Sequence, residues 1–199
     1  MKQLQIFLFL TMISFKSYAN LSDETVCIEI DGQIRNGIIY LLNNTKPFNG
    51  KNLCEYENGQ IKSIGNYTDG AKNGKWDEWY KNSKVKLDVN FKDGKKDGKW
   101  IEWHENGKLY AVGNYKDGNW TGKATLWYKN LQIKQEENHK NGSKNGKWAY
   151  WYENGQIEID GNYKGNKKEG KWIWWSKNGH VVKEATFKDG ECISGDCSN

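Results

Sequence analysis

The fold is decided by the stretch from residue 146 to residue 169, which reads GKWAYWYENGQIEIDGNYKGNKKE. Its pattern recurs with a period of 24 residues, and no insertion or deletion breaks it. The Gly-Lys pair that opens each unit begins at Gly50, Gly74, Gly98, Gly122, Gly146 and Gly170. Self-similarity at a fixed period is the signature of repeat architectures. The sequence therefore predicts one domain built from six copies of a single structural unit.

Each unit is expected to form a β-hairpin. Its first half is rich in the aromatic residues that strands favour, as in the stretch 76–80. An asparagine follows, with glycine after it in four of the six units, and Asn-Gly is a strong hairpin signal. Asp69-Gly70 and its counterparts then turn the chain into the next hairpin. With one proline and no run of helical period, we predict an all-β protein: an elongated single antiparallel sheet of about six 24-residue β-hairpin repeats.

Two rows of tryptophans follow from this repeat. A two-residue Asn-Gly loop would place Trp100 opposite Gly113, where an indole can cover a cross-strand glycine. A three-residue turn with a bulged glycine would shift the register by one and exchange the rows. The sequence leaves both turns open. The candidate binding residues are Trp76, Trp100, Trp148 and Trp172 in the first row, and Trp79, Trp103, Trp127, Trp151 and Trp175 in the second.

A single-layer sheet has no second layer to bury both rows. Tryptophans three residues apart in a strand lie on opposite faces unless a bulge intervenes. Lysine stems laid across the rings can cover part of this surface. We expect some aromatic surface to remain exposed, and large exposed apolar patches tend to mark binding sites.

The four cysteines, Cys27, Cys54, Cys192 and Cys197, allow three disulfide pairings. Strands spaced about 4.8 Å apart give a sheet roughly 55–60 Å long over six units. Two cysteines belong to each end of that sheet, which favours Cys27–Cys54 and Cys192–Cys197 as caps of the open edges. A zinc site is the alternative, but the three histidines lie far from the cysteines in sequence.

The first residues have the layout of a secretory signal peptide. Lys2 precedes an apolar run from Leu4 to Phe15, and the small residues Ser17 and Ala19 stand at the −3 and −1 positions of a cleavage site. We therefore expect a signal peptide over 1–19, a capping segment over 20–49, six repeats over 50–193 and a tail over 194–199. Paired cysteines agree with a secreted, periplasmic or cell-surface protein.

The repeat resembles a known family. The pattern Gly-Lys-Trp-x-x-Trp-Tyr-x-Asn-Gly-x-Ile, followed by Gly-Asn-Tyr-Lys-Asp-Gly, is similar to the bacterial variant of the MORN repeat. The resemblance covers about residues 38–193 and implies an elongated antiparallel sheet with a role in protein or membrane association. Members of this family are often described as antitoxins of toxin–antitoxin pairs. The fourth unit departs most, with Ala124 in place of the pattern's first Trp, Leu131 in place of its Gly and His139 in place of its Tyr.

The composition points to binding and not to catalysis. The aspartates before glycine suit turns, and no histidine stands beside a nucleophile. Charges of both signs are interleaved, without the basic stripe of a nucleic-acid binder. We expect no enzyme activity, no cofactor and no metal. The expected function is a non-catalytic scaffold that binds a protein partner through the Trp and Tyr rows. The alternatives are binding of carbohydrate or cell wall, of anionic lipid, or of a toxin in the manner of an antitoxin.

Overall fold

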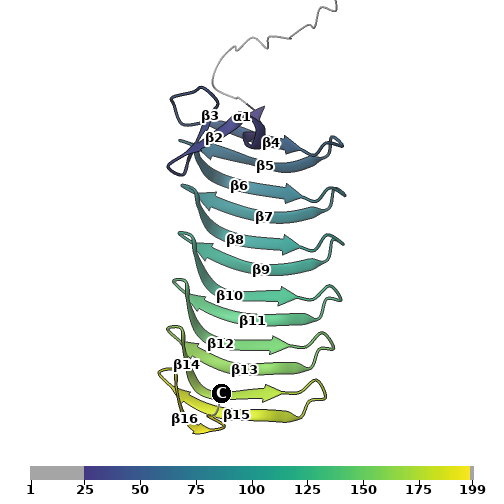
Figure 1. The fold of residues 1–199 in the computed structure, drawn as a ribbon, viewed down its shortest axis with the longest axis vertical. Coiled ribbons are helices and arrows are strands. Elements are labelled where there is room, and N and C mark those ends of the chain that lie inside the picture. Colours follow the sequence, from purple (N-terminus) through teal and green to yellow (C-terminus); the bar gives the residue numbers. More distant parts are fainter. Residues whose placement is uncertain (1–24, 198–199) are drawn as a thin grey trace, which may run out of the picture.

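The computed structural model describes residues 25–197 and shows one long sheet of fourteen strands in that range (Figure 1). Six hairpins form the body of the sheet, and the strands follow one another in chain order from β4 to β16. This confirms the predicted all-β array. The hairpin strands are β4 (Gly50–Glu55) and β5 (Ile61–Thr68), β6 (Ala71–Trp79) and β7 (Val85–Lys92), β8 (Lys95–Trp103) and β9 (Leu109–Lys116), β10 (Asn119–Trp127) and β11 (Ile133–Lys140), β12 (Ser143–Trp151) and β13 (Ile157–Lys164), and β14 (Lys167–Trp175) and β15 (Val181–Lys188).

Short elements close the two ends of the array. At the first end, β1 (Thr25–Val26) pairs in parallel with β4, and a small hairpin of β2 (Gly32–Arg35) and β3 (Ile38–Leu41) follows a one-turn helix, α1 (Ile28–Asp31). Ile39 and Phe48 of this cap pack against the first hairpins. At the other end, β16 (Glu191–Gly195) pairs with β15. The predicted signal peptide, residues 1–19, lies outside the described residues.

Tight turns link each hairpin to the next. They lie at the strand ends along one side of the sheet, which we call the Asp-Gly edge. Asp69 and Gly70 both have positive φ, at 49° and 73°, which is the conformation of a type I′ turn. This two-residue turn matches the twist of antiparallel strands. Asp93-Gly94, Asp117-Gly118 and Asp189-Gly190 repeat it, so the predicted role of the Asp-Gly pairs is confirmed.

The loop within each hairpin lies at the Asn-Gly position, on the side of the sheet that we call the Asn-Gly edge. This loop has features of both predicted turns. Tyr80 donates its N–H to the carbonyl of Lys84 and accepts from the N–H of Ser83, whose φ is 63°. This is a three-residue loop that ends in a left-handed residue. A further irregularity between Glu78 and Trp79 restores the register. Trp100 therefore pairs with Gly113, as the two-residue loop predicted.

The first tryptophan row is buried on one face, which we call the core face. Trp76, Trp100, Trp148 and Trp172 are only 2–9 % exposed. Each indole alternates across the sheet with a smaller residue, for example Val89 between Trp76 and Trp100. Edge-on aromatic neighbours and a lysine complete the cover: the ring of Trp76 lies 5.5 Å from that of Tyr67 and 3.6 Å from the Lys72 ammonium. A single layer can therefore bury one full row, which goes beyond the partial cover expected from sequence.

The fourth unit restores the same packing with different residues. Ala124 stands where other units have the first tryptophan, and Trp120 stands where they have a lysine. A Cβ on Gly113 would lie 2.2 Å from the Trp120 ring, just as one on Gly161 would meet Trp172. The indole has moved four residues along the strand and still covers the glycine.

Side chains at the Asn-Gly edge tie each unit to the next. The Tyr80 hydroxyl donates to the carbonyl of Trp103, 2.7 Å away and 23 residues further on, and the Asn82 amide donates to the carbonyl of Glu105. His104 makes the equivalent contact with Trp127. The tyrosine bond recurs between Tyr56 and Trp79, Tyr128 and Trp151, and Tyr152 and Trp175. These tyrosines therefore join neighbouring units through their hydroxyl groups.

We call these inter-unit hydrogen bonds the ladder. Their contribution to stability can be tested with Tyr80→Phe, which removes one of the bonds and leaves the ring. We expect the free energy of unfolding in urea to fall by about 1 kcal/mol, because the Trp103 carbonyl loses its partner. Tyr110→Phe, on the same face, is the matched control and should cost less than about half as much, since no hydrogen bond of that hydroxyl is seen among residues 25–197. Equal effects of the two substitutions would remove the ladder from the stability account.

Candidate functional site

The second tryptophan row lies on the opposite face, which we call the open face. Each of its tryptophans pairs across a hairpin with an aliphatic residue, as Trp103 does with Leu109. Paired residues of antiparallel strands point to the same side of the sheet. The result is a line of alternating rings and aliphatic side chains from β6 to β15. This tryptophan stripe consists of Trp79, Val85, Trp103, Leu109, Trp127, Ile133, Trp151, Ile157, Trp175 and Val181.

The tryptophan stripe is a continuous apolar row that remains partly accessible to water. Its five tryptophans are half-buried, whereas Val85 and Val181 are 38 % and 53 % exposed. The cap elements pack on the core face, where Ile39 and Phe48 join the cluster around Tyr67 and Trp76. The structure therefore separates the two candidate rows: the first is buried on the core face, and the second is partly exposed on the open face.

Charges beside the tryptophan stripe are balanced. Lys123 and Glu136 form an ion pair at 2.6 Å, and Lys171 and Glu184 form one at 2.9 Å. Similar pairs join Lys75 to Asp77 and Lys147 to Asp160. Such exposed pairs add little to stability. They leave the face without a strong field of either sign.

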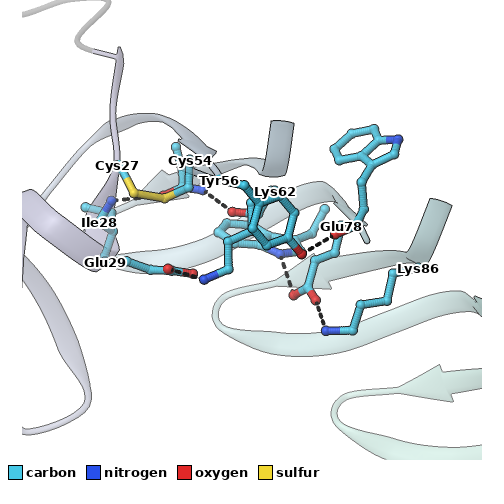
Figure 2. A network of polar contacts seen from close by, with 12 residues as sticks. Cys27, Ile28, Glu29, Cys54, Tyr56, Lys62, Glu78 and Lys86 are labelled. Atoms are coloured by element: carbon cyan, nitrogen blue, oxygen red, sulfur yellow. Dashed lines mark hydrogen bonds and ion pairs between the residues drawn. A yellow bond between two sulfur atoms is a disulfide. The ribbon is translucent and has the colours of Figure 1, made fainter. Parts of the chain in front are cut away.

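A pocket on the core face marks the first unit (Figure 2). Asn52 takes the position that Trp76 has in the next unit, 24 residues on, so one indole of the row is missing there. Asn52 is 2 % exposed; its amide donates to the Ser63 hydroxyl, and its carbonyl oxygen accepts from the N–H of Ile28 in α1. Sequence reasoning missed this pocket, although the departure of residue 52 from the repeat is visible in the sequence.

Two ion pairs stand at the rim of the pocket. Glu78 accepts from the indole N–H of Trp76 and binds Lys86 at 3.0 Å, and Glu29 of α1 binds Lys62 (Figure 2). Both carboxylates are thus neutralised by a lysine from a hairpin strand. The helix is held over the pocket by one of these pairs and by the bond to Asn52.

Burial perturbs two titrating groups that line this pocket. Desolvation, with a smaller contribution from Glu29, raises the pKa of Tyr67 to about 12. Desolvation lowers the pKa of Lys72, more strongly than nearby Glu78 raises it. Both shifts reflect the cost of placing a charge among the aromatic side chains of the core face.

The cysteines pair as predicted. Cys27 joins Cys54 with a Cα–Cα distance of 4.6 Å, and Cys192 joins Cys197 at 5.6 Å. The first bond fixes the segment before α1 to β4, and the second closes the chain back beside β16. Each disulfide therefore lies at one end of the array, where the sheet edge is open.

Within the described part of the chain, the histidine, cysteine and acidic side chains do not gather into a metal site. Over residues 25–197, no cluster of three or more His, Cys, Asp or Glu side chains is arranged to hold a metal ion. His139, which replaces a tyrosine, lies between the rings of Trp120 and Trp148 and 3.5 Å from Glu137. His104 takes a tyrosine's place in the inter-unit ladder.

Within the same residues, the structure contains no helix whose length and apolar character suit a membrane crossing.

Comparison with known families identifies the repeat. The model of the MORN repeat variant matches residues 48–69, 96–117, 144–164 and 168–189, which correspond to the first, third, fifth and sixth hairpins. The second and fourth units have the same hairpin in the structure. A search of the curated proteins finds no match to this chain.

The assignment of the two rows predicts different costs of truncation. Trp100→Ala should destabilise the protein by about 3–5 kcal/mol, because it opens a cavity in the buried row. Trp103→Ala, three residues away on the open face, should cost about 1–2 kcal/mol, since that side chain is already partly exposed to water. Urea unfolding followed by circular dichroism measures both, and a larger loss for Trp103→Ala would reverse the assignment.

The pKa of Tyr67 predicts a loss of stability in alkali. Its phenol ionises near pH 10 when unfolded and at about 12 when folded, so the neutral form is favoured by folding. The stabilisation is complete below pH 10 and disappears as the pH rises toward 12. Tyr67→Phe should therefore lose less stability than the parent between about pH 9.5 and pH 11.5 in urea titrations. Parallel losses in the two proteins would contradict the prediction.

Proposed function

We propose that this protein of MORN-variant repeats is a non-catalytic interaction module that binds a protein partner through the tryptophan stripe. One observation carries the proposal: an unbroken line of five half-buried indoles and five aliphatic side chains runs along the open face. Tryptophans held rigidly in a sheet lose little conformational entropy on binding, and they are frequent anchors at protein interfaces.

The surroundings of the stripe favour a protein over an anionic membrane. The ion pairs beside it neutralise four lysines of the open face, which lowers the positive potential available to attract lipid headgroups. A polar rim around an apolar centre is the usual anatomy of a protein interface. A glycan remains the second candidate, because indoles on every second strand recur about every 10 Å as flat platforms.

We place the protein outside the cytoplasm, in the secreted or envelope fraction. Two disulfides support this location, because such bonds persist in oxidising compartments. The signal peptide predicted for residues 1–19 supports it from the sequence. A location outside the cytoplasm makes the role of a cytoplasmic antitoxin the weaker alternative.

The proposal can be tested by affinity capture from envelope and host extracts with the disulfide-bonded protein. The test variant carries Trp103→Ala, Trp127→Ala and Trp151→Ala, which remove the centre of the stripe. We expect a saturable partner retained by the parent and reduced at least tenfold with this variant, corresponding to about 1.4 kcal/mol or more.

A matched variant, Lys99→Ala, Lys123→Ala and Lys147→Ala, changes the same three units on the same face but leaves the stripe intact. It should retain the partner. Equal capture by the parent and the tryptophan variant would exclude the stripe as the binding surface. Binding to a polysaccharide, with weak dependence on salt, would replace the protein partner by the glycan, and salt-sensitive binding to anionic vesicles would replace it by lipid.

A further inference from the structure

The pocket on the core face exists because the first unit omits one ring from a periodic row. In the next two units the corresponding position is Trp76 or Trp100, both buried, and the Trp76 ring lies over Gly65 of the preceding strand. In the first unit the position holds Asn52, whose short side chain stays at the floor and bonds to Ser63. Ile28 and Glu29 of helix α1 line its outer side, and the adjacent Cys27–Cys54 disulfide ties the start of that helix to β4 (Figure 2). We call this space, lined by Asn52, Ser63 and the aromatic residues around them, the vacancy.

The walls of this vacancy remain aromatic although its floor is polar. Tyr67 and Trp76 line it, with their rings 5.5 Å apart and edge to face, and Tyr56 lines its Asn-Gly side. Aromatic walls contact the apolar face of a sugar or an aryl ring, while a few polar groups fix its orientation. Ser63 accepts a hydrogen bond from Asn52 and has a hydroxyl hydrogen to donate.

The charges that line the vacancy do not cancel. Glu29 is paired with Lys62, and Glu78 is paired with Lys86. Lys72 remains: among residues 25–197 its ammonium has no carboxylate at ion-pair distance and faces the rings of Trp76 and Phe91 instead. A partly desolvated cation with a face toward an open pocket attracts an anion.

We propose that this pocket binds a ring-bearing carboxylate, with the ring in the place of the missing indole and the carboxylate on Lys72. The ring packs against the walls formed by Tyr56, Tyr67 and Trp76, and the Ser63 hydroxyl donates to the carboxylate or to a ring hydroxyl. A sugar acid and an aryl acid share this chemistry. The site lies on the core face and meets the tryptophan stripe only at Trp79, whose backbone carbonyl accepts from the Tyr56 hydroxyl, so the three stripe tryptophans replaced in the capture experiment lie outside it.

The experiment is isothermal titration of the disulfide-bonded protein with four probes. Glucuronate and benzoate carry a ring and a carboxylate, glucose carries the ring alone, and acetate carries the carboxylate alone. We expect at least one ring-bearing carboxylate to bind at least tenfold more tightly than both glucose and acetate. The tighter of the two identifies the kind of ring. Absence of binding by both acids at millimolar concentration overturns the proposal, and so does equal binding of acetate or glucose.

Variants of the pocket separate a built site from general attraction to lysines. Lys72→Gln should weaken the binding of the preferred acid at least tenfold. Lys96 occupies the equivalent position in the next unit, over the ring of Trp100, and Lys96→Gln should leave the binding unchanged. Asn52→Trp restores the residue of the repeat and should abolish binding by filling the space.

Two further outcomes decide the assignment. Equal weakening by Lys72→Gln and Lys96→Gln would show that the acid binds lysines of the core face in general, which contradicts the proposal. The stripe variant, with Trp103, Trp127 and Trp151 replaced by alanine, should bind the acid as the parent does. Failure of the pocket proposal can therefore be distinguished from failure of the stripe proposal.

Discussion

The structure depends on how a lone sheet buries indole rings. Trp76, Trp100, Trp148 and Trp172 are buried without a second layer, because each ring lies beside a small cross-strand residue and under a lysine or an aromatic edge. Gly161 shows how tight this packing is, since a Cβ there would lie 2.2 Å from the Trp172 ring. The two faces therefore become unequal. On the core face, the aromatic side chains pack against one another and are buried. On the open face, the second row of tryptophans stays in contact with water.

This inequality connects stability to binding. The Gly-Lys glycines, such as Gly98 with φ of 101°, sit where the pairing between hairpins is interrupted near the Asp-Gly edge. The pairing of Trp103 with Leu109 lies next to a second irregularity, which recurs in each hairpin, so the members of the tryptophan stripe keep the same position from one hairpin to the next. A surface of this kind is preorganised, and a partner has little ordering of side chains to compensate.

Much of the fold could be predicted from the sequence, because a 24-residue period constrains every unit at once. The hairpins, the Asp-Gly turns and the two disulfides were all predicted correctly. The choice of exposed row was not predictable, because it depends on two successive irregularities at the Asn-Gly edge whose effects on register cancel. Neither leaves a distinct sequence signal: Asn82 fits both turns, and the bulge beside Trp79 follows from packing. The pocket could have been predicted only by comparing Asn52 with the residues at the same position of the other repeats.

The hydroxyl of Tyr80 bonds to a backbone carbonyl of the next unit and not to a side chain. A carbonyl is present whatever residue occupies that position, so the joint between neighbours does not depend on their sequences. The fourth unit illustrates the freedom this gives, since it changes its tryptophan, glycine and tyrosine positions and still accepts His104 from one neighbour and donates through Tyr128 to the other. Gene duplication or loss of a whole 24-residue segment would therefore preserve every joint, and the length of the molecule is free to evolve separately from its surface.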